Sequence, residues 1–392
     1  MMYRIRLTLM IGMVLICGVP LQAGPEDTAG ASLQPMWSQA DAPRSFYAAG
    51  KIHQVIAAGS HVWLIADHSP DSTDKGPWLV RTDSEGVMQA SIPMHEIPGL
   101  DRTMHWSRIP LAATRSGGLG MLVYDQNKSP VLLEFDMAAR LLRHNSLAHL
   151  PESTGGLLGL EFDGDHWLIV DSQKILRLDD ELGVVNSWST EHAEFIVAYT
   201  MDKPAHITIV LVQDDEQGYR WATRQLDSSS FRASAPTIIA QTAARHFLVD
   251  VFVPDSEHTV VVMPDIDNKG AGWQLITLSS TGKLASTAIQ IPQHVRKAYQ
   301  TRVFAEGSRV HFLSIDTRQA WHTVVNLDNT ARLSSRMLKL PRAEYESVVT
   351  HVYGAHANNR LYAGTNYRMA SGSQPIHAAA LLLLQKSWHN SP

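Results

Sequence analysis

Five side chains of the kinds that perform acid–base or metal-assisted chemistry lie in short apolar runs spread along the chain. They are His53, Glu161, Asp250, Arg302 and His351. A carboxylate or an imidazole can exchange a proton with a substrate, and a guanidinium can hold an anion. Such residues act together only if the fold brings their runs to one place. They are therefore candidate catalytic residues that depend on the fold, and the alternative is that they only bind water.

A second candidate for chemistry is the acidic segment Asp265-Ile-Asp267-Asn268-Lys-Gly270. Oxygen ligands at alternate positions followed by a glycine resemble the start of a calcium loop. The fifth position is Lys269, however, and Ile276 stands at the twelfth position, where a calcium loop has a bidentate glutamate. Asp265 and Asp267 are thus candidate Ca²⁺ ligands, with a solvated loop as the alternative. Apart from calcium, we expect no cofactor.

Other catalytic patterns are missing or out of context. Ser280-Thr-Gly-Lys283 matches the Ser-x-x-Lys spacing of some acyl-transfer enzymes, which requires a helix to place the lysine beneath the serine. Here it lies between two alternating runs, and this context predicts a hairpin turn. The nineteen histidines form no His-x-x-x-His or His-Glu-x-x-His pattern, and the chain has no Gly-x-Ser-x-Gly elbow.

The elements that would position these residues form a repeat. An apolar run ending in Asp or Ser, a short polar turn and a second run recur at intervals of 53, 43, 48, 52 and 49 residues, and the marked residues are Asp83, Asp136, Asp179, Asp227, Ser279 and Asp328. Each unit predicts a hairpin, because an aspartate side chain can bond nearby backbone amides and define a turn. Two further runs precede each hairpin, such as Leu157–Phe162 and His166–Val170.

Four strands in about 50 residues, repeated seven times, is the pattern of propeller blades. The chain resembles exported bacterial seven-bladed β-propeller repeat proteins over residues 45–388, and the resemblance is one of repeat pattern alone. It implies an all-β fold, a seven-bladed propeller of four-stranded antiparallel blades. The seventh unit ends after three strands, so we expect an N-terminal strand to close it, and Leu33–Gln39 is the candidate. An open ring and an eighth partial blade remain alternatives.

The N-terminus predicts export. Arg4 and Arg6 precede an apolar run over residues 7–19, and Ala23 suits cleavage before Gly24, as in a signal peptide. We expect residues 1–23 to be the signal, 24–44 an N-terminal segment that includes the closing strand, and 45–388 the propeller. The protein would then be periplasmic or secreted.

Composition narrows the function classes. The only cysteine, Cys17, lies in the signal, so a mature chain has neither thiol nucleophiles nor disulfides. Cleavage removes two arginines and no acidic residue and takes the formal charge from -5 to -7. A mildly acidic chain without basic runs argues against nucleic-acid binding, and we expect no membrane insertion of the mature chain.

Loops on a rigid scaffold are where binding residues gather, and the longest predicted loops belong to three neighbouring units. Trp, Tyr and Arg are enriched in protein interfaces. The candidate binding residues are Asp71, Asp74, Lys75, Trp78, His95, Glu96, Asp101, Arg102, His105, Trp106, Tyr367 and Arg368. The alternative is that these loops are only tolerated insertions.

We therefore expect an exported binding module that recognises a protein partner in the cell envelope or outside the cell, in an accessory, inhibitor or immunity-type role. The sequence leaves open whether the protein is an enzyme, and it favours a binding role over catalysis. One alternative is a hydrolase or lyase with a site in the central channel, assisted by a metal near Glu161 and Asp250. Another is a glycan or small-ligand binder. Fold alone does not choose among them, because propellers support all three.

Overall fold

The computed structural model divides the chain by its contacts into Met1–Ser32 and Leu33–Pro392, and the elements below belong to the second unit. The residues that the structure describes are 35–36, 45–48, 51–67, 77–84, 86–150, 157–191, 193–202, 206–216, 218–243, 249–255, 257–265, 272–279, 284–289, 301–306, 308–315, 319–328, 333–338, 348–357, 360–369 and 376–384.

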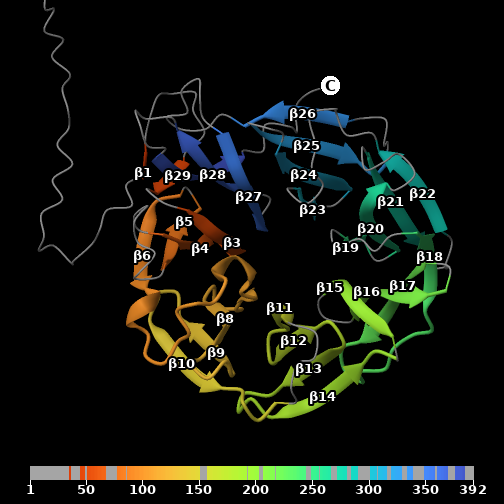
Figure 1. Cartoon of the computed structure of the whole chain (residues 1–392), viewed down its shortest axis with the longest axis horizontal. Helices are drawn as coiled ribbons and strands as arrows, with labels where there is room; N and C mark the ends of the chain where they lie inside the picture. The colour runs from red at the N-terminus through yellow and green to blue at the C-terminus, as the bar shows by residue number, and fades with distance from the viewer. Residues whose placement is uncertain are drawn as a thin grey trace, which may run out of the picture. The chain divides into compact units, whose positions relative to one another are not determined.

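Six four-stranded antiparallel sheets follow one another along the described chain, each a simple meander (Figure 1). The first contains β3 (Ile52–Ala58), β4 (His61–Ala66), β5 (Trp78–Asp83) and β6 (Met88–Pro93). The second contains β7 (Leu111–Ala113), β8 (Leu119–Tyr124), β9 (Pro130–Phe135) and β10 (Leu141–Ser146). The third contains β11 (Leu157–Phe162), β12 (Trp167–Asp171), β13 (Lys174–Leu178) and β14 (Val184–Ser189).

The next three sheets repeat this arrangement. The fourth contains β15 (Glu194–Asp202), β16 (His206–Asp215), β17 (Gly218–Asp227) and β18 (Thr237–Thr242). The fifth contains β19 (Asp250–Asp255), β20 (His258–Asp265), β21 (Gly272–Ser279) and β22 (Leu284–Ile289). The sixth contains β23 (Arg302–Glu306), β24 (Arg309–Ile315), β25 (Ala320–Asn326) and β26 (Leu333–Met337). The helical elements η2 (Met94–Glu96) and η3 (Trp106–Arg108) are single 3₁₀ turns.

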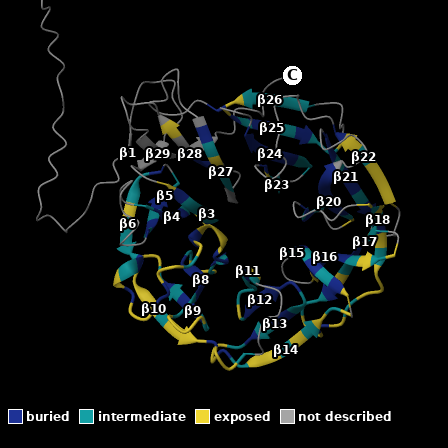
Figure 2. Ribbon diagram, viewed as in Figure 1, coloured by how far each residue is buried: buried dark blue, intermediate teal, exposed yellow. Residues whose placement is uncertain are grey.

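Each sheet buries both of its faces, and this explains why the middle strands are continuous apolar runs rather than alternating ones. All five residues of β12 are buried, for example. Each hydrophobic cluster of the described residues is shared by two sheets, which are consecutive along the chain except in the cluster that joins the first sheet to the C-terminal one. One cluster joins Leu132 of β9 to Trp167 of β12, and the next joins Ile175 of β13 to Ile209 of β16. The outermost strands β10 and β14 are mostly exposed (Figure 2).

The C-terminal strands form a sheet of a different composition. β27 (Val348–Ala357), β28 (Arg360–Met369) and β29 (Ile376–Leu384) pair in order, and β2 (Ser45–Ala48) and β1 (Pro35–Met36) follow β29. The seventh unit therefore ends after three strands, as its sequence predicted. The strand that pairs with β29 is Ser45–Ala48 rather than the expected Leu33–Gln39, because only β2 aligns with Ala379–Leu382.

The structure thus establishes an all-β propeller of four-stranded antiparallel blades. Six blades of that kind lie in the described residues, so the prediction of seven such blades is not confirmed. The difference arises at the C-terminal sheet, which takes strands from both ends of the chain.

Aspartates set the turns between the third and fourth strands. Asp136 and Asp179 each accept two backbone N–H bonds from their own turn through Oδ1. Three residues later, Ala139 (φ 60°) and Leu182 (φ 66°) adopt the left-handed conformation, and both of their side chains are buried. The aspartate was predicted from the repeat. The apolar residue at positive φ was not predicted from the repeat. Its burial beneath the turn offsets the strain of about 1 kcal/mol that the left-handed backbone conformation costs.

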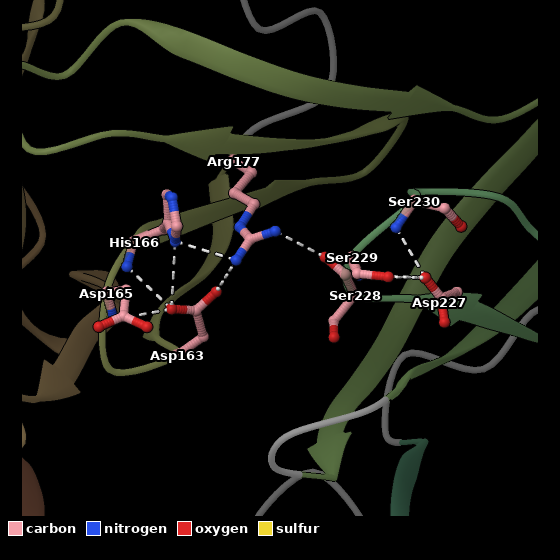
Figure 3. A network of polar contacts seen from close by, with 8 residues as sticks. All are labelled: Asp163, Asp165, His166, Arg177, Asp227, Ser228, Ser229 and Ser230. Atoms are coloured by element: carbon pink, nitrogen blue, oxygen red, sulfur yellow. Dashed lines mark hydrogen bonds and ion pairs between the residues drawn. The ribbon is translucent and has the colours of Figure 1, made fainter.

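Polar contacts also bridge neighbouring blades on this edge of the sheets. Arg177 of β13 lies 2.9 Å from Asp163 through Nη2, and its Nη1 donates to the carbonyl of Ser228 at 2.8 Å (Figure 3). Asp163 lies in the β11–β12 turn, and Ser228 follows β17, so one arginine fixes two blades. The negative charge of Asp163 is favoured by two backbone N–H bonds and by Arg177, which lower its pKa against the effect of burial.

A buried amide links the C-terminal sheet to the first blade. Asn366 of β28 accepts from the N–H of Ile52 at 2.8 Å and donates to the carbonyl of Ile52 at 2.7 Å. Asn366 is 3% exposed, and Ile52 is completely buried. The side chain therefore replaces a strand partner for a residue 314 positions away in the sequence.

Replacing Asn366 with alanine leaves both backbone groups of Ile52 buried and unpaired. We expect Asn366→Ala to lower the free energy of unfolding by about 2–4 kcal/mol, because each such group costs about 1–3 kcal/mol. Denaturant unfolding followed by tryptophan fluorescence measures this. The matched control is Asn326→Ala, which removes one exposed turn hydrogen bond and should cost less than about 1 kcal/mol. Equal effects of the two variants would contradict the role given to Asn366.

Candidate functional site

The longest described connection between two blades is the segment from Met94 to Pro110, which joins β6 to β7 and is called the crossing segment below. It lies at the same edge of the blades as the links between second and third strands. The turns between first and second strands, and between third and fourth strands, lie at the opposite edge. Backbone hydrogen bonds tie it to the second blade: Asp101 N–H donates to Tyr124 O, and Gln126 N–H donates to Gly99 O, both at 2.9 Å. Connections of this length without regular structure are usually functional or disordered, and this one is fixed.

Two of the predicted binding residues in the crossing segment are structural. Asp101 is 7% exposed and accepts hydrogen bonds from Thr103 and from Lys128, and the lysine lowers its pKa. Trp106 is 9% exposed and belongs to the cluster between the first two blades. Neither side chain is placed to meet a partner directly, since burial in the fold already uses their surfaces. Each instead holds the segment in position.

The other predicted residues of the crossing segment are accessible. Glu96, Arg102 and His105 are exposed, and so is Arg108, which the sequence reasoning did not select. Trp78 and His95 are half-buried and pack edge to face, with ring centroids 6.4 Å apart. The segment therefore presents charged side chains over a base that is packed and hydrogen-bonded.

The structure leaves the predicted patch of three loops untested, because most of two of these loops lies outside the described residues. Asp71, Asp74 and Lys75 lie outside the described residues. Tyr367 and Arg368 belong to strand β28 rather than to a loop; Arg368 is exposed, and the side chain of Tyr367 is outside the description. These residues stay predictions, and of the three predicted loops only the crossing segment is fully described.

A cavity of about 320 Å³ lies where the innermost strands begin, and it is called the channel cavity below. Its lining includes Asp250 of β19 and Arg302 of β23, so the fold brings together two of the five predicted catalytic candidates. The inner strands β3, β19, β23 and β27 all contribute to it and surround the centre in Figure 1. Ser107 of the crossing segment completes one side.

Asp250 has an unusual protonation equilibrium. Burial raises its pKa to about 7, although the hydrogen bond from Val251 N–H and the charge of Arg302 both favour the carboxylate. Desolvation penalises a charged carboxyl more than these two contacts compensate. Near neutral pH the side chain is therefore divided between an acid that donates and a carboxylate that accepts a proton, which suits an acid–base group.

Glu161 is connected to the same region through Tyr199 of β15, a residue that sequence reasoning missed. The Tyr199 hydroxyl donates to the Glu161 carboxylate, and burial together with the charges of Glu161 and Asp250 raises the tyrosine pKa well above its usual value. Gly159 makes room for this hydroxyl, since a Cβ there would lie 1.7 Å from it. The only sequence signal was a tyrosine within a predicted inner strand.

His53 and His351, the remaining two candidates, lie on the neighbouring strands β3 and β27. His53 Nε2 lies 2.7 Å from Asp67 Oδ1, and both side chains are about a quarter exposed. Burial and the charges of Lys51, Arg302 and His53 lower the pKa of His351. Arg302 thus acts on His351, but neither His53 nor His351 is part of the cavity lining. Of the five candidates, the cavity lining therefore contains Asp250 and Arg302, and a catalytic role for any of the five stays a prediction.

No metal centre emerges among the described residues, where no group of three His, Cys, Asp or Glu side chains is arranged to hold an ion. Asp267 lies outside the description. Asp265 ends strand β20, and its side chain is outside the description as well. The calcium prediction therefore stays a prediction. Within the described part of the chain, no helix is long and apolar enough to span a membrane.

Comparison with known proteins adds no assignment. Neither a family model nor a curated protein sequence matches the chain. Similar solved structures include the polysaccharide lyase Uly1 (10% identity, TM-score 0.47, 93% of this chain and 94% of that chain) and a chain of the yeast Nup82–Nup159–Nup116 nucleoporin complex (8%, 0.47, 85% and 97%). The Neurospora crassa Pan2 WD40 domain is a third (11%, 0.36, 85% and 90%). At these scores the likeness carries no argument about activity or partner.

The raised pKa of Asp250 makes a prediction about stability. The folded protein holds this proton up to about pH 7, whereas an unfolded aspartate releases it near pH 4, so the contribution of Asp250 to stability is lost as pH rises between these values. We expect Asp250→Asn to be more stable than the parent at pH 8, by about 2–4 kcal/mol, and equal to it near pH 4.

Denaturant unfolding at pH 4, 6 and 8 measures this difference. The matched control is Asp180→Asn in the exposed turn after β13, which should leave the pH dependence unchanged. An Asp250→Asn variant that is destabilised equally at all three pH values would contradict the assignment.

Proposed function

We propose that this propeller is a binding module that recognises a protein partner through the exposed side of the crossing segment. The observation that carries the proposal is the fixed presentation of Arg102, His105 and Arg108 on a long connection that hydrogen bonds tie to the second blade. A surface that is already ordered loses little conformational entropy on binding. Arg102 and Arg108 outnumber the exposed acid Glu96, which favours an acidic surface on the partner.

Reversing both arginine charges tests this proposal. We expect Arg102→Glu combined with Arg108→Glu to abolish or weaken partner binding by at least about tenfold, since like charges then face each other. Both side chains are exposed, so the fold should be unaffected. The experiment is capture from native envelope extract by the mature protein, with quantitative mass spectrometry of the retained proteins.

Arg140→Glu serves as the matched control, because Arg140 is 80% exposed in the hairpin turn after β9, on the opposite edge of the blades. A partner retained by the parent and by Arg140→Glu, but lost from the double variant, supports the proposal. A set of retained proteins that is identical for all three forms would overturn it.

We further propose that the protein is exported and acts in the periplasm or outside the cell, as an accessory, inhibitor or immunity-type protein. The support is the pattern of residues 1–23, with Arg4 and Arg6 before an apolar run that ends at Ala23. The native protein is then expected to begin at Gly24 and to appear in the osmotic-shock or culture fraction. Mass spectrometry of its N-terminal peptide tests this; a chain that keeps Met1 and stays in the cytoplasmic fraction would contradict it.

We also propose that the sheet of β27, β28 and β29 is a seventh blade, with β2 as its outer strand. Two hydrophobic clusters support this, because one packs the sheet against the sixth blade and the other packs it against the first. The Asn366 hydrogen bonds to Ile52 belong to the second of these interfaces, so the Asn366→Ala experiment also measures the strength of the closure.

A further inference from the structure

An unpaired hydroxyl lies in the wall of the channel cavity. Thr301 is 3% exposed, and its Oγ1 has no hydrogen-bond partner among the described residues. Burying a hydroxyl without a partner costs about 1–3 kcal/mol, so such a group in a native fold calls for an explanation. Because Thr301 lines the cavity directly before Arg302, a molecule in the cavity can supply the missing bond.

Arg302 is the cation of the cavity and is not neutralised by an ion pair. Its side chain is exposed to the cavity, and no acidic group of the described chain lies within ion-pair distance of it. The acid that it influences is Asp250, which is itself only partly ionised near neutral pH. A guanidinium in this position is free to form a two-point contact with a carboxylate.

The rest of the lining favours a small molecule over a peptide segment. The volume of about 320 Å³ is at the small end of the range for small-molecule pockets, which is about 300–1,000 Å³. Trp273, Phe304 and Tyr353 give the wall aromatic surface, and Gln54 and Ser107 add polar groups. Aromatic walls with a few convergent polar groups are typical of such sites.

We propose that the channel cavity binds a small organic acid, whose carboxylate pairs with Arg302 and whose hydroxyl or amide group hydrogen-bonds to Thr301. The site shares Ser107 with the crossing segment, but Arg302 and Thr301, which would hold the acid, do not belong to that segment. The two proposals therefore fail or succeed independently, through different variants.

Binding should be accompanied by proton uptake. The charged or titratable groups that act on Asp250 are Arg302 on β23 and Tyr199 on β15, whose hydroxyl is bonded to Glu161 on β11. A bound carboxylate places a negative charge beside Arg302 and weakens the attraction of Arg302 for the Asp250 carboxylate. Asp250 then takes up a proton as the acid binds, so affinity falls as pH rises above about 7.

The test uses 4-hydroxybenzoate, succinate and gluconate, each beside its uncharged amide, with titration calorimetry on the mature protein at pH 6.5. At least one acid is expected to bind, and its amide to bind at least about tenfold more weakly. Arg302→Gln should lose at least about tenfold in affinity for that acid, whereas Arg309→Gln, at the opposite end of the same hairpin, should bind like the parent. Failure of all three acids to bind, or equal binding by Arg302→Gln, overturns the proposal.

Two further variants separate this site from nonspecific attraction of anions to an arginine. Thr301→Val keeps the charge of Arg302 and should weaken the acids that carry a hydroxyl but not succinate. Asp250→Asn should remove the proton uptake, which is measured from the binding enthalpy in buffers of different ionisation enthalpy. If Thr301→Val leaves all affinities unchanged and proton uptake persists in Asp250→Asn, the site is not the one described.

Discussion

The structure depends on the burial of both faces of every sheet against its neighbours. A sheet whose middle strands are apolar on both faces cannot be stable alone, so the end sheets of an open row would expose an apolar face. In this chain the last sheet packs against the sixth blade on one side and against the first blade on the other. The two hydrogen bonds from Asn366 to Ile52 fix the register of the second interface. The inner strands that line the channel cavity belong to these packed sheets, so the positions of their side chains depend on this packing.

The sequence was sufficient for the parts of the fold that are set by local chemistry. Hairpins were predicted from aspartates such as Asp136 and Asp179, whose side chains bond the amides of their own turns. Contacts across large separations were not predictable in the same way. The pairing of β2 with β29 joins opposite ends of the chain, and Leu33–Gln39 and Ser45–Ala48 are both short runs with aromatic side chains, so local sequence does not decide which of them pairs. The burial of Trp106 was missed for a related reason, since a tryptophan in a long loop looks the same whether it faces solvent or fills the space between two blades.

Two titratable groups with strongly shifted pKa values, His322 and Asp250, show how a residue of the core differs from a residue that lines a cavity. His322 is 2% exposed, its ring stacks on that of His311, and its Nε2 lies 3.0 Å from His311 Nδ1. Burial, together with the charges of His311 and Arg336, lowers the pKa of His322 to about 3. The fold keeps it neutral, so its contribution to stability is lost as pH falls from about 6.5 towards 3. The contribution of Asp250 to stability depends on pH in the opposite direction, because its stabilising proton is lost as pH rises towards 7. His322 lies within the interior of a blade, where a neutral ring packs well. Asp250 lines the channel cavity, and an acid with a perturbed pKa in a cavity is a candidate site residue.

The crossing segment connects the outer surface to this cavity within three residues. Trp106 fills the core between the first two blades, Ser107 lines the channel cavity, and Arg108 is exposed. Gln54 of the innermost strand β3 donates to the carbonyls of Trp106 and Ile109, so the segment is bonded to the channel wall on both sides of Ser107. A partner that displaced Arg108 would therefore act on residues that Gln54 holds through these two hydrogen bonds. The proposed partner surface and the proposed ligand site therefore share one rigid element, and any coupling between them must pass through Gln54 and Ser107.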